Sequence, residues 1–229
     1  AISVEQGQPV AAIKLTPMQM DIDLDKSLGD QMTNKYEATV SALKEPVTMP
    51  SVGGFIPILV FENKYILDGH HRWSQVLMTN PNAKMKVDNL VSPALGTGQK
   101  GAEKALKATQ LAIAALAGNV ETKNTKTNLL EFPAEQLYDY VVKNINEEVL
   151  QLLTKAGKIP KPDKKLAGEY YMNNLKLVQE KPPGKFKRVD AMPQADDSGV
   201  PQATVNKALE KGAINFDNPS ASDIKKAAE

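Results

Sequence analysis

Short apolar runs and alternation of apolar with polar residues dominate the first ninety residues, a pattern typical of β-strands. Within the same stretch, residues 34–44 and 71–78 repeat apolar side chains at helical spacing. Residues 62–64 separate two of the apolar runs and are expected to form a hairpin turn, while Pro57 favours the start or the edge of its strand. The predicted strands, in chain order, are residues 10–15, 55–61, 65–67 and 84–91.

Beyond residue 92 the pattern changes to longer stretches with helical periodicity. Helices are predicted at residues 102–117, 134–155 and 164–179, with a polar linker at 118–128. After the two prolines at 182–183 the chain is poor in apolar residues, so this last part is not expected to build a core of its own.

These patterns predict a fold of the α+β class in three parts. The parts are a small mixed-sheet domain at residues 1–92, a mainly helical region at 93–180 and an extended, proline-rich tail at 181–229. A segment without a core is ordered only through contact with something else. We therefore expect the tail to lie against the protein's own body or against another protein subunit.

Composition limits the classes of function without selecting one. Apolar residues make up 41% of the 229 residues and charged residues 24%, values typical of globular proteins. A formal net charge of +1 provides no general attraction for a phosphate backbone, so nucleic acid is not favoured as a partner. The absence of cysteine excludes disulfides, thiolate nucleophiles and cysteine-bound structural zinc, and no motif points to haem or flavin.

The distribution of apolar residues also bears on location. No apolar run approaches the roughly 20 residues that a membrane span needs. The first residues lack the basic region and apolar stretch of a secretory leader. We therefore expect a soluble, cytoplasmic protein without a membrane partner.

The rarest side chains of the chain gather in six consecutive residues, Asp-Gly-His-His-Arg-Trp at 68–73. Both histidines, the only tryptophan and one of only two arginines lie there. They follow a predicted strand and begin a predicted helix. A helix start directs backbone N–H groups and the positive end of the helix dipole toward an anion. We therefore interpret this segment as a candidate site for anion binding and proton transfer.

Each residue of this motif suits that chemistry in its own way. Gly69 permits a close approach of backbone to phosphate, and Arg72 offers a charged, two-pronged donor. His70 and His71 donate hydrogen bonds or move protons near neutral pH. Asp68 is suited to orient a histidine, to cap the helix or to help hold a divalent metal, and the sequence leaves these roles open. The simpler interpretation is that the aspartate caps, the glycine turns, the tryptophan packs and the others face solvent.

At this motif the chain resembles the ParB/sulfiredoxin-like domain, in which a strand, a Gly-x-His-Arg or Gly-Glu-Arg-Arg box and a helix form a nucleotide-phosphate site. The resemblance rests on Ile-Leu-Val at 58–60 and on Tyr-Ile-Leu-Asp-Gly-His-His-Arg-Trp at 65–73. Residues 13–19, Ile-Lys-Leu-Thr-Pro-Met-Gln, are similar to the first strand and turn of such domains. The similarity covers about residues 10–91.

The resemblance implies specific roles for the residues of the box. Gly69, His71 and Arg72 take the place of the phosphate-binding residues, and Asp68 and His70 line the same pocket as candidate catalytic groups. The expected ligand is a nucleotide or another phosphorylated small molecule, accompanied by Mg2+. The sequence does not identify the residues that would bind a metal.

Two activities of such domains do not fit this chain, and a third, free-serine kinase activity, is only weakly indicated. Sulfiredoxin needs a cysteine just before its His-Arg pair, where this chain has His70, so sulfinic-acid reduction is excluded. Partition-type ParB proteins add a basic DNA-binding region, whereas residues 92–229 contain a single arginine. Free-serine kinases need a glutamate on an earlier segment, and the nearby candidates, Glu45 and Glu62, lie in no matching motif.

Two hypotheses of different class follow. The leading one is a protein that binds a nucleotide or phosphate, with phosphoryl transfer or nucleotide hydrolysis as the reaction if it is an enzyme. The alternative is a structural component of a larger assembly such as a phage virion, in which the domain is a packing module and the 181–229 tail contacts other subunits. This alternative is motivated by a region outside the domain that is longer than the domain itself.

Overall fold

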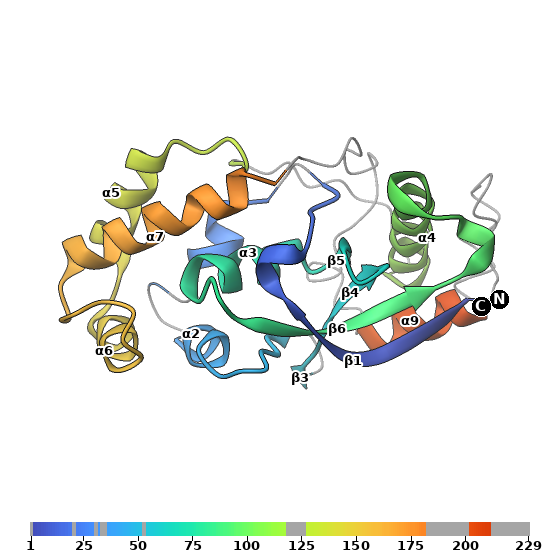
Figure 1. Ribbon diagram of the computed structural model, residues 1–229, viewed down its shortest axis with the longest axis horizontal. Coiled ribbons are helices and arrows are strands. Elements are labelled where there is room, and N and C mark those ends of the chain that lie inside the picture. The colour runs from blue at the N-terminus through green and yellow to red at the C-terminus, as the bar shows by residue number, and fades with distance from the viewer. Residues whose placement is uncertain are drawn as a thin grey trace.

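A four-stranded mixed sheet lies at the centre of the molecule, with helices on both of its faces (Figure 1). The computed structural model describes residues 2–19, 22–29, 32, 36–51, 54–117, 127–181 and 202–211. The strand order is β1-β6-β4-β5; β6 and β4 are parallel, and the other neighbours are antiparallel. A separate two-stranded ribbon joins β2 and β3. The strands are β1 (Ser3–Ala11), β2 (Pro50–Ser51), β3 (Gly54–Phe55), β4 (Ile58–Phe61), β5 (Tyr65–Asp68) and β6 (Lys84–Val91).

The helices pack on the two faces of the sheet and form two separate hydrophobic cores with it. The longer ones are α2 (Glu37–Ala42), α3 (His70–Thr79), α4 (Gly98–Ala117), α5 (Ala134–Asn144), α6 (Glu147–Lys155), α7 (Lys164–Gln179) and α9 (Gln202–Glu210). Short helical turns form at η1 (Ala12–Lys14), η2 (Asp25–Gly29) and η3 (Pro93–Leu95). Among the described residues, no helix is both long enough and apolar enough to cross a membrane.

A tight hairpin between β4 and β5 confirms the turn predicted at 62–64. Glu62 and Asn63 both have positive φ angles, 56° and 51°, as the two central residues of a type I′ hairpin do. The Asn63 N–H also donates to Oδ1 of Asn89 on β6 at 2.8 Å. Because β4 and β5 are antiparallel, the end of β5 lies beside the start of β4, with Asp68 opposite Leu59. The Asp-Gly-His-His-Arg motif therefore begins next to the start of β4.

Burial on both faces of the sheet explains why β4 is apolar at every position. Ile58 and Val60 belong to the core that includes α3, while Leu59 and Phe61 belong to the core that includes α4 and α9. All four side chains are at most 2% exposed. A strand covered on both faces has no polar side and is therefore a continuous apolar run.

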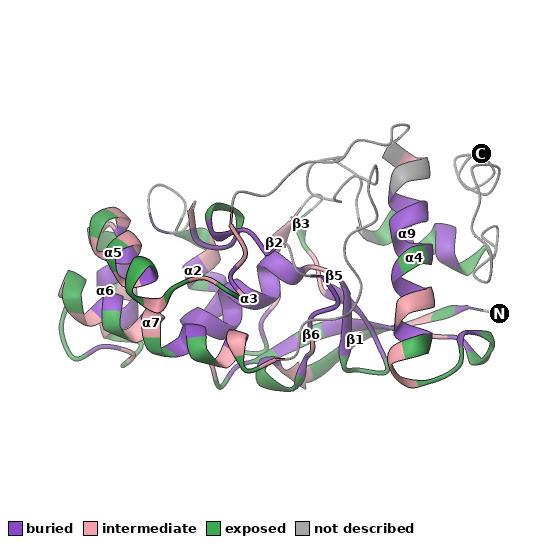
Figure 2. Ribbon diagram, turned by 90° about the horizontal axis from the view of Figure 1, so that it is seen from above, coloured by how far each residue is buried: buried purple, intermediate pink, exposed green. Residues whose placement is uncertain are grey.

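Helix α3 is buried along its whole length, as Figure 2 shows. Helix α7 packs against it and also against α5. From α7, the Asn174 amide donates to the Met78 carbonyl at 2.7 Å, and the Tyr170 hydroxyl donates to the Thr79 carbonyl at 2.6 Å. These bonds satisfy carbonyls in the last turn of α3, which have no partner within the helix. The region predicted to be helical thus holds the motif-bearing helix in place.

Two predicted elements are divided in the structure. The single helix predicted over 134–155 is wrong, because Asn146 has an extended backbone and its Oδ1 accepts the Val149 N–H at 3.0 Å, which starts a new helix. The strand predicted over 55–61 is interrupted at 56–57, where proline has no N–H to donate. In both cases the apolar pattern continues across the break and gives no sign of it.

The remaining predictions agree with the structure to different degrees. The α+β class is confirmed, and β6 and α7 have the predicted bounds. The strand predicted over 10–15 instead begins at Ser3 and gives way to η1 after Ala11. Within the stretch predicted as an extended tail, α9 forms a helix that packs against α4 and β1 and buries Val205 and Leu209. The predicted linker lies, for residues 118–126, outside the described part of the chain.

Candidate anion-binding site at the start of helix α3

Gly69 connects β5 to α3 in a conformation that side chains other than glycine rarely adopt. Its φ is 108°, and it is the N-cap of α3, which begins one residue earlier than predicted. A Cβ atom at this position would lie 2.8 Å from Cβ of Ile58 and 3.1 Å from Nη2 of Arg72. Glycine is therefore the residue that lets β4, the helix start and the Arg72 guanidinium come together.

Arg72 is buried at the helix start, with 7% of its surface exposed. Its Nη1 donates to the Ile56 carbonyl at 2.8 Å, and its Nη2 lies 3.8 Å from Oδ2 of Asp68. Within the described part of the chain, its Nε has no hydrogen-bond partner. Buried polar groups are almost always paired, so this N–H marks a position with the capacity to bind an acceptor.

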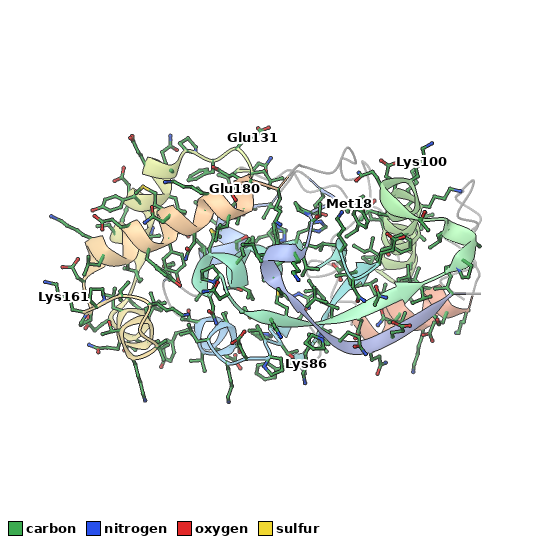
Figure 3. The ribbon with its side chains drawn as sticks, viewed as in Figure 1. Met18, Lys86, Lys100, Glu131, Lys161 and Glu180 are labelled. Atoms are coloured by element: carbon green, nitrogen blue, oxygen red, sulfur yellow. The ribbon has the colours of Figure 1, made fainter. Side chains whose placement is uncertain are left out.

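Both histidines of the motif are buried and accept hydrogen bonds from backbone N–H groups. His70, 2% exposed, accepts the Met18 N–H at Nε2 over 2.9 Å. His71, 7% exposed, accepts the Asp23 N–H at Nε2 over 3.1 Å. A ring nitrogen that accepts a hydrogen bond carries no proton, so each ring is neutral in this arrangement, with its proton on Nδ1. The histidines thus fasten two points of the N-terminal segment to α3, and Met18 lies near the middle of the molecule (Figure 3).

The motif residues therefore divide into two groups. Asp68, Gly69 and Arg72 come together at the helix start, while the two histidine rings reach to the segment around residues 18 and 23. Trp73 packs in the core, fully buried, and its Nε1 donates to the Ala12 carbonyl at 2.9 Å. The simpler interpretation is thus correct for the glycine and the tryptophan and wrong for the histidines and the arginine, which do not face solvent. The predicted catalytic and phosphate-binding roles stay predictions.

Asp88 on β6 contributes a second carboxylate near Arg72 that the sequence analysis did not single out. It is 6% exposed and accepts hydrogen bonds from the Gly7 N–H and from Nδ2 of Asn206, both at 3.2 Å. Burial raises the pKa of Asp88, while these two hydrogen bonds and the positive charge of Arg72 act to lower it. Period-two alternation in β6 gave no sign of this burial, because α9, which lies more than a hundred residues later in the chain, covers the carboxylate.

The two glutamates considered as kinase residues are engaged elsewhere. Glu45 accepts the Lys84 N–H at 2.7 Å, and Glu62 accepts the Gly98 N–H at 3.1 Å at the beginning of α4. Each carboxylate thus fixes a backbone segment. In the part of the chain that the structure describes, no three acidic or histidine side chains gather as a metal site.

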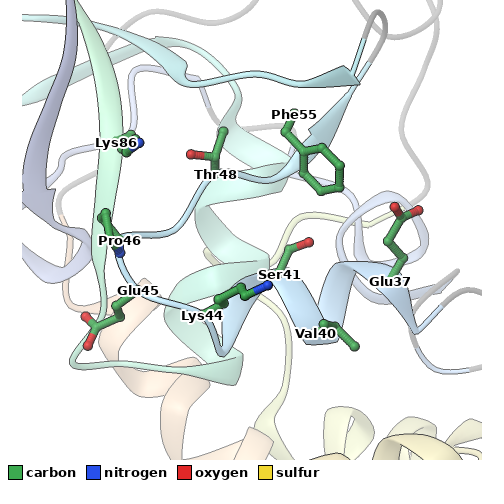
Figure 4. A pocket seen from close by; sticks show the side chains of 9 residues that line it. All are labelled: Glu37, Val40, Ser41, Lys44, Glu45, Pro46, Thr48, Phe55 and Lys86. Atoms are coloured by element: carbon green, nitrogen blue, oxygen red, sulfur yellow. The ribbon is translucent and has the colours of Figure 1, made fainter.

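A pocket of about 580 Å³ is lined by residues of α2, of the segment that follows α2, of β3 and of β6 (Figure 4). Figure 4 shows Phe55 and Lys86 on opposite sides of it, with Ser41 of α2 below them. Phe55 directly precedes Ile56, whose carbonyl binds the Arg72 guanidinium. Phe55 of the pocket and the carbonyl that binds Arg72 are thus neighbours in sequence, but no residue of the motif lines the pocket.

Comparisons of the chain with protein-family models, with curated proteins and with solved structures find no match. The resemblance to the ParB/sulfiredoxin-like domain accordingly stays a prediction from residues 58–60 and 65–73. The chemistry of the site has to be inferred from its geometry.

Proposed function

We propose that the protein binds a phosphate group, carried by a nucleotide or another phosphorylated small molecule, at the start of helix α3. The observation that carries this proposal is the state of Arg72. Its guanidinium is buried beside a glycine N-cap, and its Nε–H has no acceptor in the described part of the chain. Phosphate oxygens are strong, geometrically matched acceptors for a guanidinium fork.

The helix start adds an attraction for the same kind of ligand. Gly69 has no side chain, so the N-cap residue itself supplies no side-chain oxygen to the first turn of α3. The first turn of a helix carries the positive end of the helix dipole, which stabilises a nearby anion by about 0.3–1 kcal/mol at an exposed site and by more in a partly buried one. An oxyanion between the helix start and Arg72 benefits from both sources of positive potential.

The carboxylates around Arg72 make a magnesium-bound nucleotide a better ligand than a bare phosphate. Asp68, 15% exposed, lies 3.8 Å from the guanidinium, and the buried Asp88 also interacts with its charge. Mg2+ bound to nucleotide phosphates needs only one or two protein carboxylates. Asp68 fits that role, and we expect nucleotide affinity to be higher with Mg2+ than without it.

The histidines contribute to this proposal by shaping the site. They hold the chain at Met18 and Asp23 beside the helix start. If turnover occurs, phosphoryl transfer or nucleotide hydrolysis is the reaction class, with Arg72 stabilising charge on the phosphate and Asp68 taking the proton. His70 is not assigned this role, because its Nε2 already accepts the Met18 N–H and its Nδ1 carries the ring proton.

Isothermal titration of the full chain with ATP, GTP, CTP and inorganic phosphate, with and without Mg2+, tests the proposal. Arg72→Lys keeps the charge but loses the Nε–H and the fork, so it is expected to weaken binding by at least about tenfold. Lys161→Ala removes an exposed charge at the far end of the molecule (Figure 3) and is expected to leave binding unchanged. Thermal denaturation checks that both variants are folded. Binding by none of the probes, or equal affinity in the Arg72→Lys variant, would refute the proposal.

A component of a larger assembly, such as a virion, is the second candidate function. One observation favours it: most of the large apolar side chains that are exposed in the described part of the chain lie around α2. The described part of the predicted tail, in contrast, is α9, which packs on α4 and β1 of its own chain. An assembly of this protein is therefore expected to use the surface around α2 rather than α9.

A further inference from the structure

Three exposed apolar side chains gather on one side of the molecule around α2. Among the described residues, the large apolar side chains that are exposed are Phe55 at 57%, Tyr36 at 44%, Val40 at 41% and Ile13 at 39%. All of these except Ile13 line one or both of two pockets, and Val40 lines both. Single exposed apolar residues are normal, but a group of them beside hollows is typical of a contact site.

The second of these pockets, of about 430 Å³, lies between α2 and α6. Tyr36 and Val40 belong to the α2 side, and the partly exposed Leu152 belongs to α6. The two helices are neighbours at one end of the molecule (Figure 1). We name Tyr36, Val40, Glu148, Leu152 and Lys155 the α2–α6 surface.

Opposite charges stand at the two ends of α6 on this surface. Glu148 lies in its first turn and Lys155 in its last, and both line the pocket. They are separated by roughly 10 Å along the helix axis. Within the described part of the chain, neither of them forms an ion pair. The surface therefore has an apolar centre with an acidic end and a basic end.

We propose that the α2–α6 surface binds a second copy of this chain, with the two α6 helices antiparallel about a two-fold axis. A two-fold axis pairs a surface with itself, so Glu148 of each copy faces Lys155 of the other. Leu152, which lies between these residues in sequence, then comes close to the axis, and Val40 is withdrawn from water. A formal net charge of only +1 produces little repulsion between two copies. None of these residues belongs to the motif at 68–72, so this inference is independent of the phosphate site.

Sedimentation of the full chain over a wide concentration range tests the first part of this inference. We expect a monomer–dimer equilibrium that Val40→Lys weakens by at least about tenfold, because the substitution places a charge in an apolar contact. The matched control is Ile13→Lys, since Ile13 is equally exposed but outside the surface. A wild-type chain that stays monomeric overturns the proposal in favour of a different protein as the occupant. Equal weakening by both substitutions overturns it as well.

Charge-reversed variants test the two-fold arrangement itself. Glu148→Lys places two lysines opposite each other, and Lys155→Glu places two glutamates opposite each other, so each variant alone is expected to dimerise roughly tenfold more weakly. A mixture of the two variants restores both opposite-charge pairs and is expected to form a heterodimer with affinity close to that of the wild type. Circular dichroism checks that α6 is intact in each variant. A mixture that dimerises no better than the separate variants overturns the proposal.

Discussion

Replacing Gly69 by alanine is expected to destabilise the protein by about 2–6 kcal/mol, the sum of two costs that the structure identifies. The first is conformational: a φ of 108° costs a residue with a side chain about 1–3 kcal/mol. The second is steric, because the new methyl group would lie 2.8 Å from Cβ of Ile58, which is 1% exposed in β4. Overpacking of this kind costs about 1–3 kcal/mol.

Gly157 offers a matched control for the conformational cost. It follows α6 with a φ of 75°, and nothing lies within 4 Å of a Cβ atom added there. Gly157→Ala therefore carries the cost of a positive φ alone, about 1–2 kcal/mol. The difference between the two variants reports mainly on the contact between Gly69 and Ile58.

Urea denaturation followed by circular dichroism gives the free energy of unfolding of the wild type and of both variants. Typical domains are stable by about 5–15 kcal/mol, so the expected loss is large enough to measure. Equal losses in the two variants would refute the close packing of Gly69 on Ile58.

Three further predictions concern residues on either side of this junction. His70→Ala removes the buried acceptor of the Met18 N–H and leaves a cavity, so we expect a loss of about 2–4 kcal/mol in urea denaturation; no loss would show that the ring does not fasten this segment. Burial raises the pKa of Asp88 above 3.8, so its contribution to stability is fullest below that pH and declines as the pH rises through the folded-state pKa. The Asp88→Asn variant is therefore expected to lose less stability than the wild type when the pH rises from 3.5 to 7. Denaturation at several pH values in that interval measures the free energy of unfolding of both proteins. Parallel plots of this free energy against pH would contradict the reasoning. Asn146→Ala removes the N-cap of α6 and is expected to cost about 1 kcal/mol, which an unchanged denaturation midpoint would disprove.

Local patterns predicted the elements whose ends are marked in the sequence. In β6, residues 84–91 alternate between apolar and polar side chains, and turn-forming residues precede and follow the strand. Helix α7 begins after Asp163, whose side chain caps it. The break between α5 and α6 was missed although Asn146 is followed by two glutamates, which is a helix-start signal. The apolar periodicity runs through Ile145 without interruption and concealed it.

The candidate site was found from the sequence because its residues are rare and adjacent. Adjacency, however, does not determine where side chains point. His70 and His71 are consecutive with Arg72, yet their rings bind Met18 and Asp23 while the guanidinium binds Ile56. These partners lie 16 to 52 residues away in the chain.

The sequence by itself determined the α+β class, the strand-to-helix junction at Gly69 and the identity of the unusual residues there, because these depend on periodicity, turn chemistry and composition. Only the tertiary structure decided that α9 covers Asp88, that Arg72 is buried with an Nε–H lacking an acceptor among the described residues, and that Val40 is exposed beside α6. Burial and pairing depend on which distant segments meet. Those contacts are set by packing of the whole chain, which no local pattern encodes.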